Sequence, residues 1–448
     1  MELTVEKISS DGRGIARTCD GVIFVSGALP GEVAEAEVVE RKRDFAFARI
    51  RRLIQANPRR AAPICAVYGT CGGCQLQHAS YELQLEIKAD VVRDALSRIG
   101  GFELDCNLSS LVCQPSPQLW GYRNKASFPV RKIKGKPTAG FYEANSHRVT
   151  LFENCPVNAV PLNELFYIMQ SELPGLQLDV YNEREHKGAL RHIILRAGIH
   201  TGQTLVSLVL NGRLNARNMK RIIQLSRHLK NATTFTINHN SRPGNVILGD
   251  RTETIKGDGL ISEHLDDWLL RYDTSSFFQI NTDQACTLYR HAQNLARAGK
   301  NSNILELYSG VGSLTCYLSE ANSLIAVEEW GRAADLMEQN LKDNGIRNVR
   351  VSKGKADELM AGLSVKDDIP GPYDLVVLDP PRSGCERAVL ERIMELGIGR
   401  VIYVSCNPAT LARDAKILKE GKYALKSVQA FDMFPQTVHV ETVVLMER

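Results

Sequence analysis

From about residue 276 onward, short apolar runs alternate with helical patterns along the chain. The apolar runs are "NILELY", "SLIAVE", "YDLVVL" and "RVIYVS", and each is followed by a polar or glycine-containing turn. Continuous apolar runs of this length are typical of parallel strands buried on both faces, and helices usually connect such strands. The alternation therefore predicts an α/β domain over residues 276–448 with a doubly wound, Rossmann-like sheet.

The first two strands of this predicted sheet carry the signal for a nucleoside cofactor. Gly310 and Gly312 follow the run "ILELY", and glycine lets backbone approach a ligand closely. The second strand ends in Glu328, and an acid there can accept hydrogen bonds from both ribose hydroxyls. A dinucleotide site would require a third glycine where this chain has Thr315. Its absence, together with Glu306 on the first strand, favours S-adenosylmethionine, which has no phosphate to bind.

Two further acids follow later strands. Asp357, in "SKGKADEL", is expected beside the adenine, and Asp379 follows the buried run "YDLVVL". Ligands bind outside the carboxyl ends of strands in open α/β sheets, which is where Asp379 is expected. The alternative is an aspartate that caps a rigid turn made by Pro380 and Pro381.

Cys406 ends another apolar run, in "RVIYVSCNPATLARD". A lone buried cysteine is usually a small core residue, but a thiolate beside a methyl donor has a specific use. Addition of a thiolate to C6 of a pyrimidine makes C5 nucleophilic enough to accept a methyl group, after which a base must remove the C5 proton. Glu441, within the apolar run "VHVETVVLM", is the candidate base, and His439 is a weaker candidate expected on the same strand face.

Four motifs together, "SFFQIN", "DPPRSG", "SCNPATLARD" and "MFPQTVHVETV", resemble those of the RNA uracil-5-methyltransferases. The most similar kind carries an N-terminal TRAM domain and an iron–sulfur cluster and acts on 23S ribosomal RNA. The resemblance implies a class I, Rossmann-like methyltransferase sheet, with Cys406 as nucleophile and Glu441 as base. It implies cofactor contacts at Gln279, Tyr308, Ser313, Glu328 and Asp379. The family commonly has Asn where this chain has Ser313.

The N-terminal half shows two other kinds of pattern. Residues 1–56 contain short alternating runs punctuated by Gly and Pro, which predicts a small oligonucleotide-binding-type β-barrel. By resemblance this barrel is the TRAM domain, which binds RNA. Residues 57–275 mix strand and helix patterns, which predicts a separate α/β central domain. The resemblance implies that this domain carries the iron–sulfur cluster, and we expect an RNA-binding surface on it.

Eleven cysteines, an odd number, in a chain with no export signal argue against a disulfide framework. Cys65, Cys71 and Cys74 have the spacing C-x5-C-x2-C, typical of metal ligands. Cys155 precedes a proline and matches the fourth ligand in the family. Cys106 and Cys113 are less favoured. Four thiolates suit zinc as well, but the resemblance favours a [4Fe-4S] cluster.

The charge pattern indicates a nucleic-acid partner. Net charge is only +4, but residues 41–60 carry eight basic side chains and residues 122–136 carry six. Such stretches suit phosphate contacts, and solvated loops are the alternative reading. The resemblance favours 23S ribosomal RNA over transfer RNA, and a catalytically silent RNA-binding or ribosome-assembly protein is the rival class. No apolar run approaches the roughly 20 residues of a membrane span, so we expect a cytoplasmic protein with no membrane partner. The sequence carries no signal for oligomeric state, and we expect a monomer.

Overall fold

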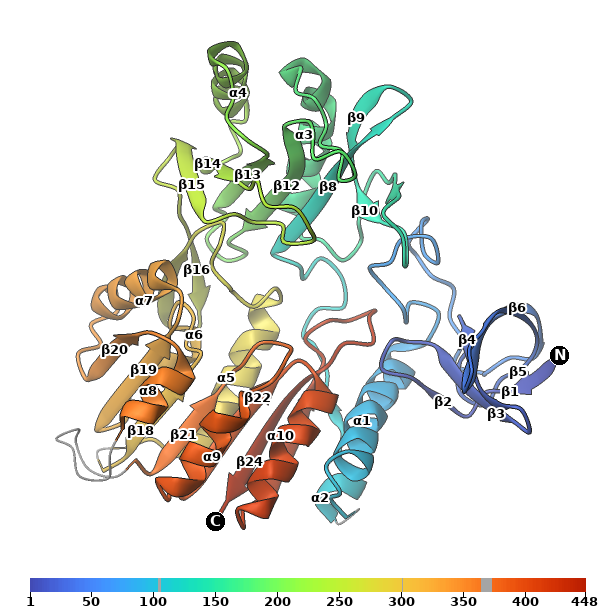
Figure 1. Ribbon diagram of the computed structural model, residues 1–448, viewed down its shortest axis with the longest axis vertical. Helices are drawn as coiled ribbons and strands as arrows, with labels where there is room; N and C mark the ends of the chain where they lie inside the picture. The colour runs from blue at the N-terminus through green and yellow to red at the C-terminus, as the bar shows by residue number, and fades with distance from the viewer. Residues whose placement is uncertain (104–105, 300, 364–372) are drawn as a thin grey trace.

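The N-terminal module is a six-stranded sheet. The computed structural model describes residues 1–103, 106–299, 301–363 and 373–448. The strands are β1 (Glu2–Thr4), β2 (Lys7–Ile8), β3 (Gly14–Thr18), β4 (Gly21–Ser26), β5 (Val33–Arg41) and β6 (Phe45–Gln55). Their order is β1-β5-β6-β4-β3-β2, and alternate residues such as Ile23, Val25 and Ala48 form a small core. Figure 1 shows this module set apart from the large sheet.

A second six-stranded sheet forms the central region. Its order is β15-β14-β13-β12-β8-β9. The strands are β8 (Lys125–Ile133), β9 (Lys136–Ala139), β12 (Leu190–Ala197), β13 (Thr204–Leu210), β14 (Thr234–His239) and β15 (Arg251–Lys256). Helices α3 (Val160–Leu176) and α4 (Ala216–His228) pack on it and close a core of its own. The ladder of β10 (Phe141–Tyr142) with β11 (Val149–Thr150) flanks it. The ladder of β16 (Ile261–Leu265) with β17 (Trp268–Tyr272) instead packs into a core of the C-terminal sheet.

The C-terminal region is built on an eight-stranded sheet of order β20-β19-β18-β21-β22-β24-β23-β7. The strands are β7 (Cys113–Gln114), β18 (Asn303–Leu307), β19 (Ser323–Glu328), β20 (Val349–Lys353), β21 (Leu375–Leu378), β22 (Arg400–Ser405), β23 (Ala424–Phe431) and β24 (Glu441–Glu447). The strands from β20 to β22 are parallel, whereas β24 runs antiparallel to β22. The predicted doubly wound sheet is confirmed.

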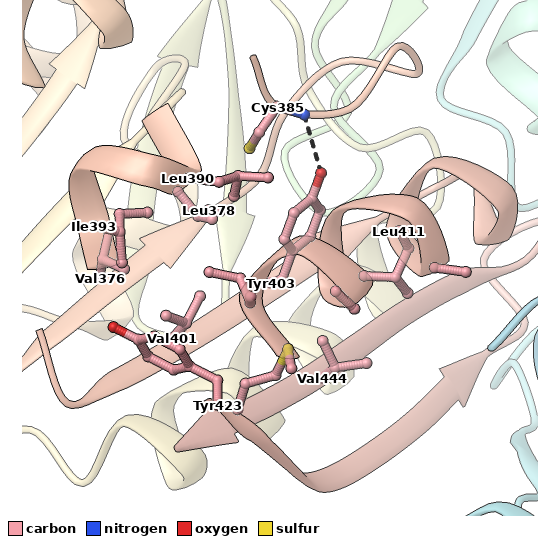
Figure 2. Packing of buried hydrophobic residues seen from close by; sticks show 14 of the residues in the cluster. Val376, Leu378, Cys385, Leu390, Ile393, Val401, Tyr403, Leu411, Tyr423 and Val444 are labelled. Atoms are coloured by element: carbon pink, nitrogen blue, oxygen red, sulfur yellow. Dashed lines mark hydrogen bonds between the residues drawn. The ribbon is translucent and has the colours of Figure 1, made fainter. Parts of the chain in front are cut away.

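Helices cover both faces of this sheet, as its continuous apolar strands require. They are α5 (Thr282–Ala296), α6 (Ser313–Tyr317), α7 (Gly331–Asp343), α8 (Ala356–Gly362), α9 (Arg387–Glu395) and α10 (Pro408–Glu420). Alternate strand residues enter two cores, Val376 and Leu378 on one face and Leu375 and Val377 on the other. Figure 2 shows part of the first core, where α9 and α10 lie over the strands.

The helix α1 (Tyr81–Arg98) begins after Ser80, whose side chain accepts a hydrogen bond from the Leu83 amide, and ends before Gly100 and Gly101 as the sequence predicts. Its residues Val92 and Leu96 join the core of the C-terminal sheet rather than that of the central sheet. The short helix α2 (Cys106–Ser109) and strand β7 follow, and β7 pairs with β23. Thus α1 and β7, within the range expected for the central domain, pack against the C-terminal sheet.

Candidate active site

The order of the strands brings Asp379, Cys406 and Glu441 to one edge of the sheet. Asp379 follows β21 and Cys406 follows β22, and these neighbouring strands are parallel. Strand β24 runs the opposite way, so its first residue, Glu441, lies at the same edge. Ser405 pairs with Thr442, which sets Cys406 and Glu441 beside each other at the end of the ladder.

This group of side chains is withdrawn from water. The side chain of Glu441 is almost fully buried, at 3% exposure, while Cys406 and Asp379 are partly buried. Burial raises the pKa of Glu441 well above its ordinary value, and the Asp379 carboxylate raises it further. Burial also raises the pKa of Asp379 to about 7. The pKa of the Cys406 thiol is raised to about 11, first by burial and then by the Glu441 carboxylate.

One positive charge opposes these shifts. The Arg382 guanidinium lowers the pKa of Cys406, both by its charge and as a hydrogen-bond partner, and lowers that of Glu441 by its charge. Arg382 therefore favours the ionised forms of both side chains. The sequence contained one sign of this residue. A basic side chain, Arg382, follows Asp379-Pro380-Pro381, whereas an aromatic residue at this position is typical of enzymes that methylate amino groups.

The loop that carries Arg382 is tied to both β22 and α10; Figure 2 shows the bond to Tyr403 of β22. The Cys385 amide donates to the Tyr403 hydroxyl at 3.2 Å and to the Asp414 carboxylate at 2.8 Å. The Tyr403 hydroxyl donates to the same carboxylate at 2.6 Å. Gly384 allows this approach, because a Cβ there would lie 2.5 Å from the Asp414 carboxylate. Two buried polar side chains thus hold the segment between Asp379 and Cys385.

His439 does not occupy the expected position. It precedes β24 in a loop, so the prediction that it shares a strand face with Glu441 is wrong. The alternating pattern "VHVETVV" extends beyond the strand itself, and the sequence pattern alone does not show where pairing begins. Burial, followed by the charge of Arg382, lowers the pKa of His439 to about 4, so its imidazole is neutral at physiological pH.

A second constellation lies at the carboxyl ends of β18 and β19. The Glu328 carboxylate accepts hydrogen bonds from the amides of Gly310 and Trp330, each at 2.8 Å. Gly310 and Gly312 both have positive φ, and a Cβ on Gly312 would lie 2.9 Å from the Met337 side chain. The turn after β18 therefore depends on glycine and lies directly against Glu328.

Glu306, in β18, faces the same region. Its Oε2 atom is buried without a hydrogen-bond partner among the described residues, and burial raises the pKa of the carboxyl to about 8. A buried polar atom without a partner is costly, and it is satisfied when a bound group supplies a donor. Tyr308 follows β18 with a φ of 67°, Ser313 begins α6, and Asp357 lies in the first turn of α8.

The segment "SFFQIN" divides between core and surface. Phe278 is buried and stacks on Tyr272, with ring centroids 4.3 Å apart, whereas Phe277 is 65% exposed. Gln279 is buried, and its carbonyl accepts a hydrogen bond from the Asn124 side chain at 2.8 Å. Of the two phenylalanines in this segment, Phe278 is therefore a core residue and Phe277 is available to a ligand.

The four expected metal ligands line a single cavity of about 960 Å³: Cys65, Cys71, Cys74 and Cys155. Burial raises the pKa of the thiols of Cys71 and Cys155, and raises that of Cys74 to about 12. The charge of Arg123, which also lines the cavity, acts against all three shifts. Within the described ranges, no three His, Cys, Asp or Glu side chains are grouped to hold a single metal ion.

Two family profiles match this chain. The TRAM domain matches residues 1–50, and the profile described as tRNA (uracil-5-)-methyltransferase matches residues 116–448. The chain belongs to the uracil-5-methyltransferase family. It is an S-adenosylmethionine-dependent RNA (uracil-C5)-methyltransferase with an N-terminal TRAM domain, and these expectations are confirmed.

Relatives of this methyltransferase cover its whole length. An uncharacterized RNA methyltransferase of Gloeobacter violaceus is 38% identical over 100% of this chain and 96% of its own length. One from Halalkalibacterium halodurans is 34% identical with the same coverage. The crystal structure of Pyrococcus abyssi tRNA (uracil-54, C5)-methyltransferase, in complex with S-adenosyl-L-homocysteine, is 28% identical, with a TM-score of 0.77 and full coverage of both chains.

The basic stretches of this methyltransferase are partly neutralised within the protein. In residues 41–60, Arg49 and Arg51 both pair with Glu37. In residues 122–136, the aromatic residues Tyr122 and Phe128 are buried in the core and do not offer a stacking surface. No helix in the described part of the chain has the length and apolar character needed to cross a bilayer.

Proposed function

We propose that this enzyme methylates C5 of a uridine in 23S ribosomal RNA through a covalent bond between Cys406 and C6. The observation that carries this proposal is the adjacency of Cys406 and Glu441 across the β22–β24 ladder, with Asp379 beside them. A nucleophile and a base on neighbouring strands meet the requirement of C5 methylation for two groups acting on adjacent ring carbons.

The proposed reaction starts with a uridine flipped out of its stack, because C6 is not accessible in a helix. The Cys406 thiolate adds to C6, and the electrons of the C5–C6 double bond move to C5. Arg382 favours the thiolate needed for this step. C5 then takes the methyl group that S-adenosylmethionine would supply, as the sulfur–methyl bond breaks and S-adenosylhomocysteine is left. Glu441 removes the C5 proton, the double bond re-forms, and the Cys406 thiolate is expelled.

The proposed cofactor site centres on Glu328. Its two oxygens each accept one backbone amide bond, which leaves lone pairs for both ribose hydroxyls. The unpartnered Oε2 of Glu306 and the close glycine turn support a ligand at this place. The remaining proposed contacts are Gln279, Tyr308, Ser313, Asp357 and Asp379, the last also near the target base.

We also propose that Cys65, Cys71, Cys74 and Cys155 hold an iron–sulfur cluster. All four line one cavity, yet they are not grouped as ligands of one ion. A zinc ion would need every sulfur at about 2.3 Å from the same atom, whereas a four-iron cluster spreads its thiolates over four metal atoms. Arg123 supplies positive charge beside these thiolates, which suits an anionic cluster.

Transfer RNA is the second candidate substrate, because the similar Pyrococcus abyssi enzyme acts, by its name, on tRNA. The test is to map 5-methyluridine in ribosomal and transfer RNA from a strain that lacks the gene. We expect one uridine of 23S RNA to lose its methyl group, wild-type protein to restore it, and Cys406→Ala to fail. Loss confined to tRNA would reject the ribosomal substrate, and restoration by Cys406→Ala would reject the covalent mechanism.

A further inference from the structure

The loop of residues 432–440, which we term the base loop, joins β23 to β24 and leads directly into Glu441. Its first half is anchored by residues from the N-terminal part of the chain. Lys88 of α1 forms a fully buried ion pair with Asp432 and donates to the Phe434 carbonyl at 3.0 Å. The Tyr122 hydroxyl donates to the Pro435 carbonyl at 2.9 Å. The start of the base loop is therefore held in place by contacts distant in sequence.

Gln436 is the most constrained residue of the base loop. Its φ is 72°, a left-handed conformation that a non-glycine residue adopts only when its surroundings enforce it. Gln84 of α1 supplies part of that constraint. The Gln436 amide donates to the Gln84 Oε1 atom, and the Gln84 Nε2 atom donates to the Gln436 Oε1 atom, both at 3.0 Å. Both side chains are almost fully buried, at 1% and 4% exposure.

The backbone carbonyl of Gln436 is also held by hydrogen bonds. It accepts hydrogen bonds from the amides of Gln75 at 3.1 Å and Leu76 at 2.9 Å. These two residues immediately follow Cys74 in the cysteine segment, residues 65–76. The backbone after the proposed cluster ligand is thus bonded to the base loop.

An apolar cluster completes this junction. Val438 of the base loop packs in a buried group with residues of the TRAM domain, the cysteine segment and α1: Ile8, Leu29, Leu76, Ala79, Leu83 and Ile87. The remaining two residues of the loop, His439 and Val440, then lead to Glu441, which pairs with Phe431. Since Glu441 is the first residue of its strand, the path of the base loop sets how the chain enters that strand.

We propose that Gln84 and Gln436 form a latch that positions Glu441 for removal of the C5 proton, and that the cysteine segment acts on the same step through Gln436. This proposal rests on the proposed role of Glu441 as the base. Gln84 and Gln436 are positioning residues, because they act through the loop. Cys406 follows β22, and the Glu441 carboxylate only raises the pKa of its thiol, so loss of the latch should not slow thiolate addition or methyl transfer. A displacement of about 1 Å in a catalytic group is enough to cost about 100-fold in rate.

The test separates methyl transfer from release in single-turnover reactions with radiolabelled S-adenosylmethionine and substrate RNA. Gln84→Met removes both contacts to Gln436, together with the bond from Gln84 Nε2 to the Ala79 carbonyl at 3.1 Å, while keeping a similar volume and a helix-compatible residue. We expect methyl transfer into a protein–RNA adduct near the wild-type rate, and release of methylated RNA slowed about tenfold to 100-fold. Gln436→Gly, which retains the left-handed conformation without the side chain, should show the same stalled adduct.

Gln170→Met is the matched control, because Gln170 lies on α3 and its side chain also bonds a backbone amide, that of Ala139 at 2.9 Å. Gln170→Met should change neither the rate of methyl transfer nor the rate at which methylated RNA is released. If Gln84→Met slows methyl transfer and release equally and weakens S-adenosylhomocysteine binding in calorimetry, its role is structural and the latch is rejected. Wild-type release rates in both variants would also reject it.

RNA containing 5-fluorouridine separates failure of the latch from failure of the proposed function. Fluorine cannot leave as a proton does, so wild-type enzyme, Gln84→Met and Gln436→Gly should all form an adduct that survives denaturing electrophoresis. If wild-type enzyme forms none, the covalent mechanism fails. If all three form it but natural RNA shows no stalled release in the variants, only the latch fails.

Discussion

Ser405 and Thr442 pair across the antiparallel ladder between β22 and β24, and this pair brings Cys406 and Glu441 together. Each of the two side chains lies one residue beyond the pair, at the same end of the sheet. Because both lie at strand ends, the backbone hydrogen bonds of the ladder bring them close together, and the anchored base loop then sets how the chain enters β24 at Glu441. The adjacency also produces an electrostatic link, since Glu441 raises the pKa of Cys406.

Substitution Glu441→Gln should stall the reaction after methyl transfer. The amide keeps the size of the side chain but cannot accept the C5 proton as a base does. We expect labelled methyl groups in a protein–RNA band on a denaturing gel, with turnover reduced about 100-fold or more. Glu447→Gln, at the far end of β24, should release product normally. Free methylated RNA produced by Glu441→Gln at the wild-type rate would show that another group is the base.

Substitution Arg382→Met should raise the pKa of the Cys406 thiol above about 11, because Arg382 lowers it in the wild-type protein. The rate of Cys406 alkylation by iodoacetamide, measured against pH without RNA, should therefore rise at higher pH than in wild type. Arg382→Lys keeps a positive charge, so its alkylation profile should lie between those of wild type and Arg382→Met. Arg387→Met, which removes a nearby arginine paired with Glu391, serves as the control. An identical alkylation profile in Arg382→Met would contradict the assigned role.

The free energy of unfolding should fall as pH rises, because the Asp379 carboxyl group is buried. Its ordinary pKa is 3.8 and burial raises it to about 7 in the folded state. The stabilisation linked to its proton is complete below the unfolded value and is lost as pH rises through about 7. Asp379→Asn removes this dependence. The free energy of unfolding can be measured with urea at about pH 5 and about pH 8. Between these values wild type should lose on the order of a few kcal/mol relative to Asp379→Asn. If the free energies of unfolding of Asp379→Asn and wild type differ by the same amount at both pH values, the prediction is wrong.

Glu328→Gln should weaken binding of S-adenosylhomocysteine. Hydrogen bonds to a charged group contribute about 1.5–3 kcal/mol, so affinity should fall roughly tenfold to 100-fold in calorimetry. The exposed neighbouring residue provides the control, since Glu329→Gln leaves the amide bonds to Gly310 and Trp330 intact. Equal affinity of wild-type enzyme and Glu328→Gln would place the ribose elsewhere.

Cys155→Ser should lose iron, whereas Cys113→Ser should keep it. Cys155 lines the shared cavity, while Cys113 lies in β7 and is buried in the core of the C-terminal sheet. Anaerobically purified proteins can be compared by colour and by iron, sulfide and zinc content. A wild-type preparation with stoichiometric zinc and no iron would replace the iron–sulfur proposal by a zinc site.

Local patterns in the sequence indicated the strands β18, β19, β21 and β22 of the C-terminal sheet and the residues that follow them, but not that β7 joins the same sheet. A buried strand requires an unbroken apolar run, so Asp379 and Cys406 could be placed at strand ends without a structure. The glycines before α6 and the acid ending β19 likewise follow from neighbouring residues. A small N-terminal β module was expected from short alternating runs for the same reason.

Only the tertiary structure decided what those segments face. The apolar pattern of α1 predicts a buried side but does not say which core receives it, and it packs on the C-terminal sheet. The sequence likewise could not show that Phe277 is exposed and Phe278 buried, or that Gln84 bonds Gln436 across most of the chain. Periodicity reports the local geometry of an element, whereas strand order and long-range contacts depend on which complementary surfaces meet when the chain packs.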